Sequence, residues 1–140
     1  MAETEPIKAQ EFKDRLAAIC LNPAGMGLPR KIRDRTIVLM SIVMTLESGR
    51  EYSEPELNEA IKNWKARVGR ELALDHVTLR RHLVDERYLD RDPAGTTYKI
   101  RTNLDRSLFG AEVFEISPEH AINEAVEKRQ ERKRRFTGRG

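Results

Sequence analysis

Apolar residues recur every three or four positions in five stretches of the chain, the spacing that places them on one face of a helix. The first stretch runs from Phe12 to Cys20. The second, which should begin at residues 28–29, carries apolar residues from Ile37 to Leu46. Because the apolar face of the second stretch is the broadest, this helix should lie at the centre of the core.

The third and fourth helices begin at recognisable capping residues. Ser53 stands three residues before Glu56, which is the capping-box pattern, and Trp64 falls on the apolar face that follows. Asp75 is a good N-cap for a fourth helix over residues 76–87. We assign structural roles to Ser53, Trp64 and Asp75 on this basis.

Short runs with strand-like alternation complete the pattern. Residues 88–91 and 97–101 should form a hairpin around the turn at 92–95, and residues 50–52 are long enough for one more short strand. A last helix should start at residues 117–119. The order helix, strand, helix, helix, hairpin is that of a winged helix.

The sequence therefore predicts a mainly α fold of α+β type: a winged helix-turn-helix with a small β-hairpin wing and extra N- and C-terminal helices. A chain of 140 residues is long enough for one core. We divide it into an N-terminal helix and linker (1–27), a winged-helix-like domain (28–103), a connection and C-terminal helix (104–127) and a basic tail (128–140).

The composition is typical of a soluble protein, with 39% hydrophobic and 35% charged residues. The longest apolar run, residues 37–44, is interrupted by Ser41 and is far shorter than the roughly 20 residues of a membrane span. The acidic N-terminus lacks the pattern of a secretory signal, and a single cysteine, Cys20, excludes an internal disulfide. We expect a cytoplasmic protein with no membrane partner.

The net charge of +3 is distributed unevenly along the chain. Residues 128–140 contain seven basic residues against one acidic residue, Glu131, which gives +6. Residues 1–127 therefore carry −3. The basic tail is able to contact nucleic acid without sequence preference, or it serves only as a solubilising end.

Several stretches resemble a bacterial family known as domain of unknown function 2087. They are residues 28–31, the turn 49–52, residues 56–58, and above all residues 75–85 with 89–91. The resemblance covers about residues 28–100, and it implies a winged-helix-like fold of the kind often found in or beside predicted transcriptional regulators. The link from Trp64 to Asp75 is longer than is usual in the family, and both flanking helices fall outside the match.

The helix predicted at residues 76–87 is the part of such a fold that most often reads DNA. At 100° per residue, Thr78, Arg81 and His82 face away from the apolar side and are able to reach bases or phosphates. This face is either a DNA-reading surface or a solvated one. Arg80 falls inside the apolar arc, where a guanidinium needs an acidic partner, so we assign it a structural role, with a nucleic-acid contact as the alternative.

Further basic residues are candidates for phosphate contacts. One cluster lies at the start of the second helix, where positive charges oppose the helix dipole, and it is either a phosphate-binding cluster or a solvated basic turn. The others lie on the outer face of the hairpin and in the tail. The candidates are Arg30, Lys31 and Arg33, with Arg35 beside them, then Arg91, Lys99 and Arg101, and in the tail Lys133, Arg134 and Arg135.

No arrangement of catalytic residues is recognisable. The three histidines have neither the HExxH spacing of a metalloprotease nor a neighbouring set of cysteines, and the glycines at 25–27 lack the lysine of a phosphate loop. We therefore predict a protein that is not an enzyme and has no cofactor and no metal.

The leading hypothesis is a bacterial DNA-binding protein, a transcriptional regulator that places residues 76–87 in the major groove. A lone winged helix buries too little interface for tight specific binding, so we expect a homodimer through the flanking helices, whose apolar stripes exceed what residues 28–101 need. The first alternative is a protein-interaction module with the same fold. The second is RNA binding.

Overall fold

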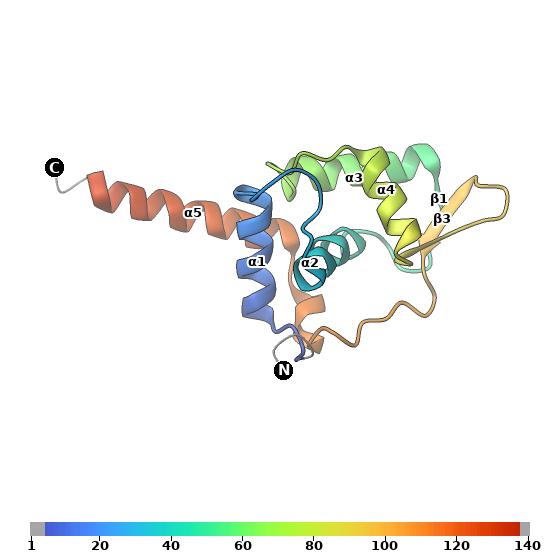
Figure 1. Cartoon of the computed structure of the whole chain (residues 1–140), viewed down its shortest axis with the longest axis horizontal. Coiled ribbons are helices and arrows are strands. Elements are labelled where there is room, and N and C mark those ends of the chain that lie inside the picture. The colour runs from blue at the N-terminus through green and yellow to red at the C-terminus, as the bar shows by residue number, and fades with distance from the viewer. Residues whose placement is uncertain (1–4, 138–140) are drawn as a thin grey trace.

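The computed structural model describes residues 5–137 of the chain, and the side chains of residues 5–135. The fold is mainly helical, with a small antiparallel sheet that includes a hairpin, which confirms the predicted α+β class (Figure 1). The helices are α1 (Ala9–Leu21), α2 (Ile32–Val43), α3 (Glu54–Arg67), α4 (His76–Asp85) and α5 (Pro118–Thr137), with a short 3-10 helix, η1 (Ala111–Glu115). The strands are β1 (Tyr52–Ser53), β2 (Leu89–Arg91) and β3 (Thr97–Ile100).

The sheet joins the hairpin to the chain that precedes α3. Its strands lie in the order β1-β3-β2, with Tyr52 opposite Tyr98 and Leu89 opposite Ile100. In the hairpin turn the amide of Gly95 donates to the carbonyl oxygen of Asp92 at 2.9 Å, and Gly95 has φ of 73°, a conformation that costs glycine little. The small sheet therefore holds the hairpin next to α4, which leads directly into β2.

Helix α2 lies at the centre of the core. Its seven residues from Ile37 to Val43 are all buried, so the helix is covered on every side. The buried Ser41 hydroxyl donates to the Val38 carbonyl at 2.6 Å and accepts from Trp64 Nε1 at 3.0 Å, which satisfies the polar atom of the largest core side chain. Trp64 therefore fixes α3 against α2.

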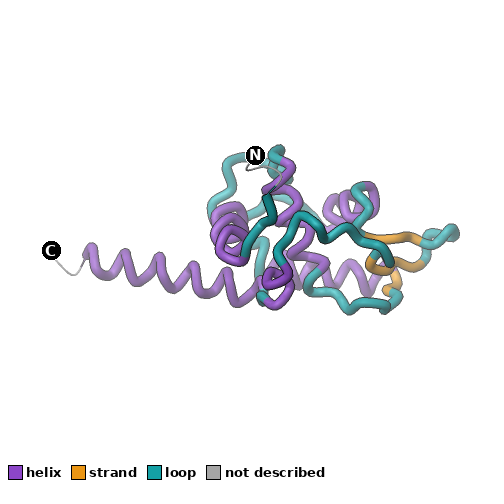
Figure 2. The backbone as a smooth tube through the Cα atoms, turned by 90° about the horizontal axis from the view of Figure 1, so that it is seen from below, coloured by secondary structure: helices purple, strands orange, loops and turns teal. Residues whose placement is uncertain are grey.

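The flanking helices α1 and α5 pack side by side and belong to the same core (Figures 1 and 2). Phe12 and Leu16 of α1 and Ile122 of α5 are completely buried, and the Phe12 ring meets the ring of Phe109 edge-on, with centroids 6.2 Å apart. From the sequence, we favour pairing of these apolar stripes between two chains over packing on the chain's own core. That expectation was wrong, because the chain covers them itself, and the argument for a homodimer through the flanking helices is thereby removed.

The predicted basic tail is helical as far as the structure describes it. Helix α5 continues to Thr137, and its C-terminal half projects away from the rest of the molecule (Figures 1 and 2). Residues 138–140 lie outside the described part of the chain. The charges of residues 128–135 are consequently carried on a regular helix.

Several predicted boundaries were wrong, and the fourth helix also ends two residues earlier than predicted, at Asp85. Helix α2 begins at Ile32, because the backbone of Lys31 is still extended, and it ends at Val43. The helix therefore ends before Leu46, the last apolar residue of the predicted stretch, and Gly49 lies in the later turn before β1 with φ of 79°. Strand β1 lies at Tyr52–Ser53, one or two residues further along than predicted, because Ser53 pairs with Thr97.

Candidate nucleic-acid interface

Helix α4 has one side in the core and one side in solvent. Leu79 and Leu83 are buried, whereas Arg81 is exposed and Thr78 is half-buried. The carboxylate of Asp75 accepts from the amide of Thr78 at 2.7 Å and caps the helix start. At the start of α3, Ser53 and Glu56 form the complete capping box. These caps fix where α3 and α4 begin and therefore which side chains each helix presents.

The neighbours Arg80 and Arg81 have different environments. The Arg80 side chain is only 17% exposed, and its guanidinium donates to Asn58 Oδ1 at 2.5 Å and lies 2.9 Å from Glu54 Oε1, both on α3. Arg81 makes no hydrogen bond or ion pair with any residue that the structure describes, Asp85 included. Arg80 therefore joins α4 to α3, and Arg81 is left in solvent.

This difference predicts opposite results for two alanine substitutions. Arg80→Ala should lower the free energy of unfolding by about 1–2 kcal/mol, because it removes a charged hydrogen bond and an ion pair whose partner Glu54 is half exposed. Arg81→Ala should change stability by less than about 0.5 kcal/mol, as exposed substitutions usually do. Chemical denaturation of both variants measures the two values, and equal small losses would show that Arg80 does not hold α4 to α3.

His82 lies beside the junction of α4 with α2 and is only partly exposed. Arg35 of α2 binds both oxygens of Glu86, Nε to Oε1 at 2.7 Å and Nη2 to Oε2 at 2.6 Å. His82 Nδ1 is 3.0 Å from Arg35 Nη2 and 2.9 Å from Glu86 Oε2. The structure thus places the predicted base-contacting His82 in a cluster that links two helices.

The Arg35 hydrogen bond holds the pKa of Glu86 below its ordinary value, although partial burial acts in the opposite direction. The lowered pKa means that this pair stabilises the fold fully above the ordinary carboxyl pKa, near 4.5, and that the contribution is lost as the pH falls through the lowered value. At neutral pH the link between α2 and α4 is therefore intact.

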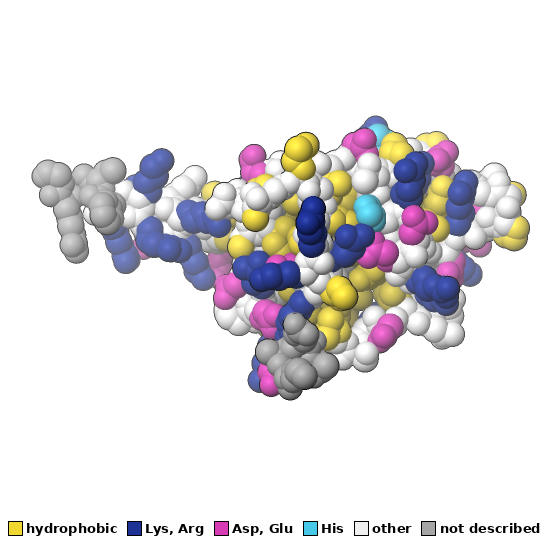
Figure 3. All heavy atoms as spheres, viewed as in Figure 1, with side chains coloured by type: hydrophobic (Ala, Val, Ile, Leu, Met, Phe, Trp, Pro, Cys, Tyr) yellow, Lys and Arg dark blue, Asp and Glu magenta, His cyan; other side chains and the backbone are white. Residues whose placement is uncertain are grey.

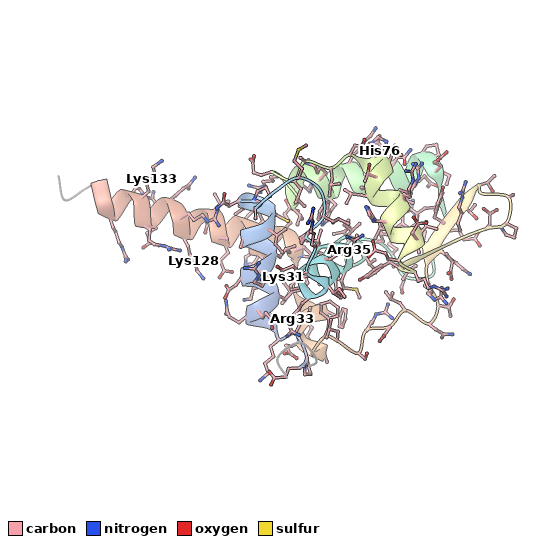
Figure 4. All side chains as sticks on the ribbon, in the orientation of Figure 1. Lys31, Arg33, Arg35, His76, Lys128 and Lys133 are labelled. Carbon is pink, nitrogen blue, oxygen red and sulfur yellow. The ribbon has the colours of Figure 1, made fainter. Side chains whose placement is uncertain are left out.

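The basic cluster at the start of α2 divides into paired and exposed residues. Arg33 binds both carboxylate oxygens of Glu11 on α1, at 2.5 and 2.7 Å, and Arg35 is bound to Glu86. The hydrogen bond from Arg33 holds the pKa of Glu11 below its ordinary value. Arg30 and Lys31 are exposed and make no ion pair within the described part of the chain. Figure 4 shows Lys31, Arg33 and Arg35 around the start of α2.

The hairpin residues divide in the same way. Lys99 is exposed, and the Arg91 guanidinium lies over the Tyr98 ring at 5.7 Å from its centroid. Arg101 lies 3.6 Å from the carboxylate of Asp90. Both Lys99 and Arg91 are exposed, but on opposite faces of the hairpin, because Lys99 lies opposite Asp90 and Arg91 lies opposite the buried Tyr98.

The predicted tail residues all lie on the projecting part of α5. This part carries mostly Lys and Arg side chains on the face seen in Figure 3, and Figure 4 marks Lys128 and Lys133 along it. Arg135 lies 2.9 Å from Glu131, while Lys133 and Arg134 also interact with other groups. All of these side chains are exposed.

Sequence reasoning missed two basic residues, the exposed Arg87 and the half-buried Lys13. Arg87 follows α4 directly and has φ of 67°, an unusual backbone conformation for arginine that turns the chain into β2. Lys13, Arg129 and Arg132 line a groove between α1 and α5. Lys13 carries no signal in the sequence, because its position depends on how α1 packs against α5.

Other kinds of site find no support in residues 5–137. Within these residues there is no group of His, Cys, Asp or Glu side chains that could hold a metal ion, and no helix is both long and apolar enough to cross a membrane. Cys20 is completely buried, and burial raises the pKa of its thiol to about 12, so it is a core residue.

Comparison with known proteins gives one match. The model of a family described as uncharacterised proteins conserved in bacteria, DUF2087, matches residues 26–100. This span begins before α2 and ends with β3, so α1 and α5 lie outside it. No curated protein and no solved structure matches the chain.

Proposed function

The chain belongs to the DUF2087 family, and we propose that this member is a DNA-binding regulator of transcription, a winged-helix protein that places α4 in the major groove. The observation that carries the proposal is Arg81. It lies in the middle of α4, exposed and without a hydrogen bond or ion pair to any described residue, although its charge contributes to the lowered pKa of Asp75 at the helix start. Arg80 beside it, in contrast, is bound to α3. A free guanidinium at this position is able to donate two hydrogen bonds to guanine.

The surroundings of α4 support phosphate contacts on either side of it. The Arg35–Glu86 pair brings the start of α2, with exposed Arg30 and Lys31, next to the end of α4. On the other side β2 follows α4 directly, and the hairpin presents Arg91 and Lys99. Cations that flank a reading helix in this way fix its register on the duplex by binding phosphates.

The acidic residues near α4 restrict where phosphate can bind. Glu86 and Glu54 are neutralised by Arg35 and Arg80, but Asp85 is exposed one turn after Arg81. A carboxylate repels phosphate and accepts a hydrogen bond from the amino group of cytosine. The proposal therefore puts base contacts, and not phosphate contacts, at the centre of α4.

Binding to duplex DNA across a range of salt concentrations tests the proposal. The logarithm of the association constant should fall linearly with the logarithm of salt concentration between about 50 and 200 mM. Each phosphate contact should add about −0.9 to the slope of this line. Fluorescence anisotropy with a labelled duplex measures this slope, and duplex RNA of the same sequence is the comparison. No saturable binding at the lowest salt, or tighter binding to the RNA, would contradict the proposal.

One observation favours a protein-interaction module as the second candidate. An open groove of about 710 Å³ runs along α3, with Tyr52, Ala60 and Trp64 in its lining and glutamates at its rim. Arg50 and Arg67, which also line it, are both paired with glutamates. This surface lies on a different side of α3 from Arg80, so both activities are compatible with one fold.

A further inference from the structure

We propose that the groove between α1 and α5, together with the basic face of α5 that continues it, is a second surface for the phosphate backbone of DNA. The inference rests on the proposed function for its ligand, a DNA duplex, and adds a contact surface outside residues 26–100. The site is built from two helices and includes the basic residues that the sequence assigns to the tail.

The groove is narrow and has basic residues at its rim. It encloses about 190 Å³, and its lining includes small side chains from both helices, Ala17 and Ala18 of α1 and Ala121 and Ala125 of α5. These small residues leave room between the helices. The cations that line it are Lys13, Lys128, Arg129 and Arg132, and the two acidic residues are Asp14 and Glu124.

The acidic residues of the groove are already engaged. Asp14 accepts a hydrogen bond from Gln10 at 2.9 Å, and Glu124 lies 3.1 Å from Lys128 Nζ, which holds the pKa of Glu124 below its ordinary value. Lys13, Arg129 and Arg132 make no ion pair or hydrogen bond with any residue in the described part of the chain. The charge of Lys13 also contributes to the lowered pKa of Glu124, but no hydrogen bond holds its ammonium group, so these three cations, from two different helices, can contact an external anion.

The basic charge of α5 is concentrated on one side of the helix. At 100° per residue, the cations from Lys128 to Arg135, except Arg134, fall within an arc of ~160°. Glu127 and Glu131 fall on the opposite arc. The residues on the basic arc are Lys128, Arg129, Arg132, Lys133 and Arg135. The arc therefore continues the rim of the groove along the projecting part of α5. Figure 3 shows Lys and Arg side chains along this part.

A linear polyanion is the ligand that fits this arrangement. The eight residues 128–135 extend about 12 Å, which corresponds to about three or four phosphates of one DNA strand, measured along the duplex axis. A preformed helix also loses less conformational entropy on binding than a disordered tail with the same charges. The surface thus favours several phosphates in a row over a single small anion.

The test compares salt dependences on a mixed-sequence duplex of about 30 base pairs. Arg129→Gln/Arg132→Gln should lower the slope of log affinity against log salt by about 2, and Lys13→Gln should lower it by about 1. The matched control is Arg50→Gln/Arg67→Gln, which removes the same charge as the first variant from residues paired with glutamates. The control should leave the slope unchanged. Circular dichroism checks that all variants are folded.

The outcomes separate this inference from the proposed function. An unchanged slope for the α5 variant overturns the inference, and so does an equal fall in the control, which would reflect net charge alone. An unchanged slope for Lys13→Gln would show that DNA does not contact the groove, and it would overturn the proposal of a site built from two helices. If these variants bind as the unmodified protein does and Arg81→Ala binds more weakly, the inference fails and the proposed function stands. If instead these variants lower the slope as expected and Arg81→Ala binds like the unmodified protein, the inference is supported and base reading by α4 is contradicted.

Discussion

Replacing Phe12 by alanine should lower the free energy of unfolding by about 3–5 kcal/mol, the range for truncating a buried aromatic side chain. Phe12 is completely buried and meets Phe109 of the connection between β3 and α5. Its removal leaves a cavity where α1, α5 and this connection join the core. The loss is a large part of the stability of an ordinary domain, so the variant should be partly unfolded at moderate temperature.

Urea denaturation measures this loss, with Met26→Ala as the matched control. Met26 is 89% exposed, so its truncation removes a large apolar side chain without opening a cavity. The control should change stability by less than about 0.5 kcal/mol. A loss below about 1 kcal/mol for Phe12→Ala would mean that α1 is an appendage, and that residues 26–100 hold their own core.

The local features of the fold could be predicted because they depend on residues close together in the chain. The capping box at Ser53, the N-cap at Asp75 and the hairpin turn at 92–95 are all formed by contacts within five residues. Helical spacing also identified the buried stripes of α1 and α3. In each case both partners of the interaction lie close together in the sequence.

The pairing of charges could not be predicted, because the partners lie far apart in the chain. Arg33 binds Glu11 of α1, and Arg35 binds Glu86 of α4, 51 residues away. In the sequence, Arg30, Lys31, Arg33 and Arg35 form one basic cluster at an unfavourable helix end. In the structure two of the four join α2 to its neighbours, which accounts for their position without a phosphate.

The flanking helices show the same limit. Their apolar stripes were visible in the sequence, but the sequence could not reveal whether they pack on the chain's own core or on a second chain. The stripes pack on the chain's own core, because α1 contacts α5 and both Phe12 and Ile122 are buried within one chain. The groove at Lys13 follows from this packing, which explains why no motif pointed to it.

Arg81→Ala should weaken binding to the preferred duplex about 5- to 150-fold, which corresponds to the ~1–3 kcal/mol of one bidentate contact with guanine. Affinity for a duplex of unrelated sequence should change much less, because phosphate contacts from the other cations remain. Anisotropy titrations with both duplexes at one salt concentration measure the two ratios. Equal weakening on both would assign Arg81 to a phosphate and not to a base.

The central claim, that α4 reads DNA sequence, is tested most directly by selecting bound duplexes from a pool of random sequences. The unmodified protein should enrich a shared motif that contains a guanine, and Arg81→Ala should lose the preference at that guanine. The Arg50→Gln/Arg67→Gln control should enrich the unchanged motif. No enrichment by the unmodified protein, or the same motif from Arg81→Ala, would contradict the claim.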